Sequence, residues 1–140
     1  MLAGFGEPFG LTRDQAFKIA RAYGAGMGTG GICGAVTGAY MILGFLVGED
    51  ADERRARFKT YEMVSEFSRR FEARRGTIIC RTLLNGIDLG TDAGRKEAME
   101  KNLFREVCPG FVRDAGEILD ELARGIRRSG VAAAERLLDH

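Results

Sequence analysis

The sequence predicts an all-α, single-domain bundle of about five to six helices, with a buried glycine-rich loop that leads into one of them. Three observations predict this class. Apolar residues recur every three to four positions in several segments, helix-cap signals bracket those segments, and no segment alternates like a strand. A chain of 140 residues can bury a sizeable core, so we expect residues 1–140 to form a single helical domain.

The first long helix is expected to begin at Thr12, which can form a capping box with Gln15. An apolar face then follows at helical spacing until the glycine run ends the helix; it consists of Ala16, Ile19, Ala20 and Tyr23.

The second helix is expected from Gly34 to near Gly48. One of its faces carries only small residues, so a neighbouring helix can approach closely, and its larger apolar residues supply core. The small residues are Gly34, Ala35, Gly38 and Ala39, and the core residues are Met41, Ile42, Phe45 and Leu46.

The third helix is expected from about Ala51 to Arg75, with Gly76 as the residue that ends it. Its core face is one apolar stripe, made of Phe58, Tyr61, Val64, Phe67 and Phe71. A short helix around Ile78 to Asn85 carries Cys80, and a polar segment capped by Thr91 or Asp92 extends to Phe104.

The last long helix is expected to open at Cys108, because Pro109 would then occupy the favoured first helical position. We expect Gly130 to break this helix and Val131 to Leu138 to form a short terminal one. The expected buried face is Val112, Ala115, Ile118, Leu119, Leu122 and Ile126.

The charge pattern and composition narrow the function classes. A net charge of +1, with acids interleaved among the basic residues, gives no reason to expect a nucleic-acid partner. The uncharged segment from Gly34 to Val47 is shorter than the about 20 apolar residues that a bilayer span needs, so we expect no membrane span. With no secretory signal and three cysteines, we expect a cytoplasmic protein with reduced thiols.

The candidate chemical residues are Cys33, Cys80 and Cys108. Each lies at the expected start of a helix, where free N–H groups and the helix dipole favour the thiolate. No Cys-x-x-Cys motif indicates a zinc ribbon or a thioredoxin-type site. The spacing alone is equally compatible with three small buried hydrophobes. His140 is the only histidine, so histidine-assisted catalysis is not expected.

The glycine run in front of Cys33 offers a second kind of site. Glycine lets a ligand approach the backbone, and a helix start attracts anions. An alternative function is therefore a small-ligand or anion-binding module that uses residues 26–34, with structural cysteines. The candidate ligand-binding residues are Gly28, Gly30, Gly31 and Gly34. A third alternative is a homo-oligomer that uses the small-residue face of Gly34 and Gly38.

The segment Cys33-Gly34-Ala35-Val36-Thr37-Gly38 resembles the C-G-A-x-x-G signature of the C_GCAxxG_C_C family, small proteins with suspected redox activity. The glycine-rich lead-in, Cys80 ahead of two leucines, and Cys108-Pro109 resemble the family as well. The resemblance implies redox activity or metal or cluster binding. The family's first cysteine has no counterpart before Cys33, so we expect the natural chain to begin further upstream.

Together these features predict a redox-active thiol protein in which Cys33, Cys80 and Cys108 converge on one site for thiol/disulfide, electron-transfer or metal/Fe–S chemistry. Cys33 is expected to be the most activated thiol, with the other two as resolving or co-ligating partners. The cofactor candidates are an Fe–S cluster or zinc held by the thiolates. The partner would be an unidentified redox partner or a small ligand.

Overall fold

The computed structural model describes residues 1–48 and 52–138, with side chains as far as Ser129. Within these residues no strand forms, so the all-α prediction is confirmed. None of the helices in this part of the chain is both long enough and apolar enough to cross a bilayer. The elements, in order, are α1 (Leu2–Phe5), η1 (Glu7–Phe9), α2 (Arg13–Ala20), η2 (Arg21–Tyr23), η3 (Gly26–Gly30), α3 (Gly34–Val47), α4 (Glu53–Arg75), α5 (Cys80–Leu83), α6 (Asp92–Glu100), α7 (Leu103–Glu106) and α8 (Cys108–Leu138).

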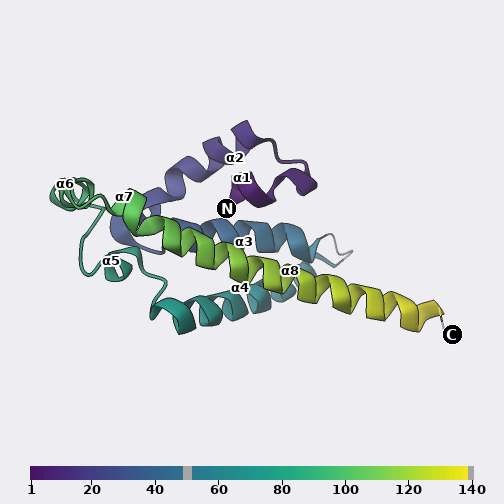
Figure 1. Ribbon diagram of the computed structural model, residues 1–140. Coiled ribbons are helices and arrows are strands. Elements are labelled where there is room, and N and C mark those ends of the chain that lie inside the picture. Colours follow the sequence, from purple (N-terminus) through teal and green to yellow (C-terminus); the bar gives the residue numbers. More distant parts are fainter. Residues whose placement is uncertain (49–51, 139–140) are drawn as a thin grey trace.

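Three helices, α3, α4 and α8, pack against one another and form the centre of the fold. Helices α3 and α8 run in the same direction and α4 runs against them (Figure 1). The starts of α3 and α8 and the end of α4 therefore meet at one end of the molecule. The short helices α5, α6 and α7 gather at that same end, and α1 packs on α3.

Side chains from these three helices fill the core between them. Phe67 and Phe71 of α4 are fully buried with their rings stacked 6.3 Å apart. They lie in one cluster with fully buried aliphatic side chains of α3 and α8, namely Val36, Ile42, Leu43, Ile118 and Leu119. Each such side chain contributes about 1.5–3 kcal/mol on burial, so this cluster dominates the stability of the fold.

Several predicted caps form as expected. Thr12 and Gln15 make the reciprocal capping box at the start of α2. Gly76 ends α4 in the left-handed conformation, with φ of 83°. Thr91, rather than Asp92, caps α6 by accepting a hydrogen bond from the Gly94 amide. The start of α4 is capped by Asp52, and Ala51, where the sequence placed it, lies outside the described residues.

Ion pairs join the antiparallel helices α4 and α8 near the site end. Arg74 pairs with Glu117 at 2.7 Å and with Glu121 at 3.2 Å. Arg75 pairs with Asp114 and lies over the Phe111 ring. Exposed pairs contribute at most about 1 kcal/mol each, so they set the alignment of the helices more than the stability.

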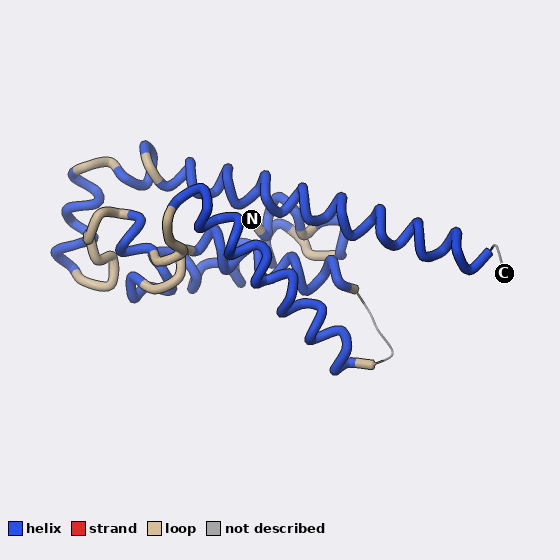
Figure 2. Tube along the Cα trace, turned by 90° about the horizontal axis from the view of Figure 1, so that it is seen from below, coloured by secondary structure: helices blue, strands red, loops and turns tan. Residues whose placement is uncertain are grey.

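Three predictions about the helices are wrong. Gly130 does not break the last helix, because α8 continues to Leu138; one glycine costs only about 1 kcal/mol relative to alanine inside a helix. Phe58 and Tyr61 are 60% and 57% exposed, because the first half of α4 diverges from α8 (Figure 2). Val112 is 45% exposed and is not a core residue.

The other exposed residues of the predicted core are Phe45 and Ile19. The Phe45 ring stacks on Phe9 at 5.2 Å, so it packs on the N-terminal segment instead of the core. On α2 only Ala16 is buried.

The small-residue face of α3 is used within the chain. A Cβ added to Gly38 would lie 2.8 Å from the Met1 Cβ, and one added to Gly34 would lie 2.5 Å from the Tyr23 carbonyl oxygen. This face therefore receives the N-terminal segments of its own chain.

Replacing Gly34 with alanine should destabilise the protein by about 1–3 kcal/mol, because the clashing atom belongs to backbone and cannot turn aside. The matched control is Gly44→Ala on the same helix, where the new methyl group meets open space and should stabilise by about 0.5–1 kcal/mol. Urea unfolding of both variants measures the difference. Equal effects of the two changes would show that the contact at Gly34 is not tight.

Candidate functional site

An isolated antiparallel β-bridge between Ile32 and Ile79 joins the two segments that carry Cys33 and Cys80. The Cys33 amide donates to the Ile78 carbonyl at 2.8 Å, and the Cys80 amide donates to the Gly31 carbonyl at 2.6 Å. These two hydrogen bonds hold the residue before α3 against the residue that opens α5.

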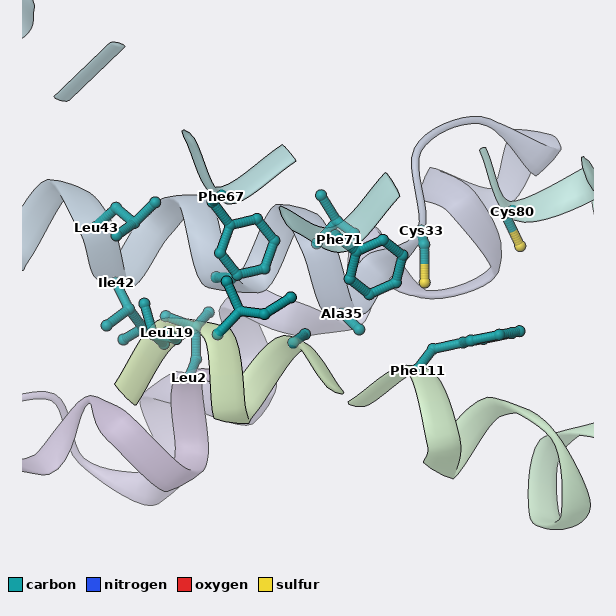
Figure 3. Packing of buried hydrophobic residues seen from close by; sticks show 14 of the residues in the cluster. Leu2, Cys33, Ala35, Ile42, Leu43, Phe67, Phe71, Cys80, Phe111 and Leu119 are labelled. Carbon is teal, nitrogen blue, oxygen red and sulfur yellow. The ribbon is translucent and has the colours of Figure 1, made fainter. Parts of the chain in front are cut away.

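The bridge places Cys33 and Cys80 on the same face. Cys33 lies opposite Ile78, two residues before Cys80, which makes the two cysteines diagonal neighbours across the bridge. Diagonal neighbours are about 7–8 Å apart between Cα atoms, whereas a disulfide needs about 4.4–6.8 Å. Figure 3 shows both sulfur atoms on the side that faces Phe111. Both thiols are free.

Cys108 reaches the same place from the start of α8. All three cysteines line one cavity with a volume of about 290 Å³. Cys33 and Cys80 are 8% and 7% exposed, and Cys108 is partly exposed. The remaining wall is almost entirely apolar or glycine; it includes Tyr23, Met41, Leu83, Leu84, Leu89, Phe104, Phe111 and Val112. The three cysteines that the sequence proposed as site residues therefore line one cavity, and their chemical role stays a prediction.

The glycine-rich loop forms the wall beside Cys80. Ala25, Gly26, Met27 and Gly28 are consecutive residues with φ between 56° and 67°, a turn of left-handed backbone. Left-handed backbone costs a non-glycine residue roughly 1–2 kcal/mol, so this turn is held by its surroundings. The Gly31 amide and the Thr29 hydroxyl both donate to the Gly26 carbonyl.

Gly26 is the glycine that most directly shapes the thiol site. A Cβ there would lie 2.9 Å from the Cys80 Cβ and 2.5 Å from the Gly31 nitrogen. Of the glycines that the sequence offered as ligand-binding residues, Gly34 lines the cavity. Gly28, Gly30 and Gly31 are not among its described lining residues; Gly30 packs on Asp88, and Gly31 makes the bridge hydrogen bond to Cys80.

Sequence reasoning missed the aromatic part of the wall. Tyr23 was assigned to an apolar helix face, and Phe104 and Phe111 were assigned no role. Phe111 packs beside Cys33 and Cys80 only because α8 begins at the end of the bundle where those residues lie (Figure 3). No signal in the local sequence indicates that placement.

Burial controls the acidity of all three thiols. It raises the pKa of Cys33, although the backbone amides of Ala35 and Val36 oppose part of the rise. Burial, and then the neighbouring thiols Cys33 and Cys108 and the Asp88 carboxylate, raise the pKa of Cys80 to about 11. Burial and Cys33 also raise the pKa of Cys108. The expected activation at helix starts is therefore reversed, because loss of hydration outweighs the helix N–H groups.

The donor atoms are not arranged around a metal. Among the residues that the structure describes, no three His, Cys, Asp or Glu side chains are close enough together to hold a metal ion.

Alkylation of Cys80 by iodoacetamide should be slow at pH 7 and should rise steeply only as the pH approaches 11, because the thiolate is the nucleophile. The raised pKa of Cys80 also makes the free energy of unfolding depend on pH. The stabilising contribution of this thiol is fully present below its ordinary pKa of 9.0 and is lost as the pH rises from 9 to about 11. Peptide mass spectrometry after timed alkylation measures the first effect, with the guanidinium-unfolded chain as control. Equal rates in the folded and unfolded chains would refute the burial argument.

One comparison with known proteins gives a match. A family model described as "Putative redox-active protein (C_GCAxxG_C_C)" matches residues 1–122. No curated protein matches the chain, and no solved structure does. The matched residues include all three cysteines, the glycine-rich loop and the three central helices as far as the middle of α8. The chain therefore belongs to the C_GCAxxG_C_C family of putative redox-active proteins.

Proposed function

We propose that this protein is a thiol-based redox protein and that its site is the cavity lined by Cys33, Cys80 and Cys108. The observation that carries the proposal is the convergence of three free thiols, from three distant parts of the sequence, on one cavity. Membership of a family described as putative redox-active proteins also supports a redox function.

Cys33 and Cys80 are the pair that forms the disulfide in this proposal. The bridge holds their segments together and both thiols line the same cavity, and a disulfide needs their Cα atoms within about 4.4–6.8 Å. On oxidation the two thiols lose two protons and two electrons to an acceptor, and one S–S bond forms.

Cys108 is the resolving thiol. Cys108 is the most accessible of the three thiols, and its charge contributes to the raised pKa of Cys80. A thiol in this position can attack the Cys33–Cys80 disulfide, form a new disulfide with one of the two cysteines and release the other as a thiol, so that one disulfide remains and becomes more accessible for reduction by an external thiol.

A metal or Fe–S centre is the competing use of the same thiols. Zinc and Fe–S clusters usually take four protein ligands, and three separated thiols do not supply such a set without movement of the cavity walls. The donor geometry therefore favours thiol/disulfide chemistry over a resident metal.

Mild oxidation with diamide under argon should convert two of the three thiols into one Cys33–Cys80 disulfide. Free-thiol titration should fall from three to one, and peptide mapping should identify the pair. Cys108→Ser should still form the disulfide, whereas Cys33→Ser should not. The two Cys→Ser variants make the same chemical change at two residues of one cavity, so each serves as the control for the other.

Metal and acid-labile sulfide analysis of the anaerobically purified protein completes this experiment. If the parent protein holds stoichiometric zinc, or stoichiometric iron and sulfide, and each Cys→Ser variant loses it, the site is a metal centre and the disulfide proposal is wrong. Three thiols that stay reduced under diamide would contradict redox activity at this cavity.

A further inference from the structure

Resting on this proposed function, we propose that the thiol cavity binds an uncharged, two-ring quinone, which accepts the electrons of the Cys33–Cys80 pair. The proposal follows from the charge, size and shape of the cavity, taken with the stoichiometry of thiol oxidation.

A charged ligand would find no oppositely charged side chain on the wall of this cavity. None of its described lining residues carries a charged side chain, and the three thiols and the Tyr23 hydroxyl are its polar side-chain groups. Phosphate-bearing nucleotide carriers and charged thiols such as glutathione would lose hydration here without a partner. An uncharged ligand avoids that cost.

The volume and the wall fit an aromatic ring system. A cavity of about 150 Å³ binds benzene, and this one has about 290 Å³, which is room for two fused rings. Tyr23, Phe104 and Phe111 supply aromatic faces on the wall, where offset or edge contacts with a ring are favourable. Phe104 and Val112 line the cavity and are also 45% exposed, so they form an apolar rim through which a ring can enter.

The stoichiometry selects a quinone among uncharged ring compounds. Oxidation of the pair releases two electrons and two protons. A quinone takes up two electrons and two protons and remains uncharged as the hydroquinone. The balanced step breaks the S–H bonds of Cys33 and Cys80, forms one S–S bond and places one hydrogen on each quinone oxygen.

The binding test uses Cys33→Ser protein, which cannot complete the redox step, and two ligands matched in size. At pH 7, 2-naphthol is neutral and 2-naphthoate is anionic. Calorimetry should show 2-naphthol binding at least about tenfold tighter. Val112→Arg at the rim should narrow or reverse this preference. Phe58→Arg is the matched control, because Phe58 is similarly exposed but lies outside the cavity. Equal binding of both ligands would overturn the claim of an uncharged site.

The redox test mixes the reduced full chain with one equivalent of 2,3-dimethyl-1,4-naphthoquinone under argon. Methyl groups block both carbons at which a thiol could add, so only electron transfer remains. One hydroquinone should form per two thiols lost, in the parent chain and in Cys108→Ser, and none in Cys33→Ser.

The two proposals fail in different ways. If diamide produces the Cys33–Cys80 disulfide but the quinone does not, the quinone proposal is wrong and the thiol-redox function stands. If neither oxidant produces it, the thiol-redox function itself is wrong.

Discussion

The two hydrogen bonds of the Ile32–Ile79 bridge are the interaction on which the site depends. They are the point at which the glycine-rich loop, the start of α3 and the segment after α4 are held together. Both amides belong to cysteines, so the backbone contact sets the positions of two thiols directly. Gly26 then packs against Cys80, and Gly34 against the Tyr23 carbonyl, in spaces that no side chain could share. The left-handed turn of residues 25–28 follows from the need to bring this backbone so close.

The arrangement of the long helices explains why a third thiol joins the first two. Helices α3 and α8 run in the same direction, so their first residues lie at one end, where α4 also finishes (Figure 1). Cys33 precedes α3, and Cys108 opens α8. The ion pairs of Arg74 and Arg75 with α8 hold α4 and α8 in the alignment that brings these ends together. The thiol cavity is thus a consequence of helix direction.

Burial gives this site an unusual chemical character. Backbone amides at the starts of α3 and α8 favour the thiolates of Cys33 and Cys108, but burial removes the water that would stabilise a thiolate, and the net effect is to raise the pKa of each cysteine. Protonated thiols in an apolar cavity are protected from adventitious oxidation, because the thiolate is the reactive form.

The amino-acid sequence by itself determined the local features of this protein: the capping box of Thr12 and Gln15, the glycine end of α4, and the helix starts next to Cys33 and Cys108. Each depends on residues a few positions apart, whose chemistry acts within one turn. The tertiary structure alone decided the exposure of Phe58 and Tyr61, the continuation of α8 past Gly130, the place of Phe111 beside the thiols and the net rise of the cysteine pKa values. Those properties depend on how helices diverge and how much water reaches a side chain, and these are set by contacts between residues far apart in the chain.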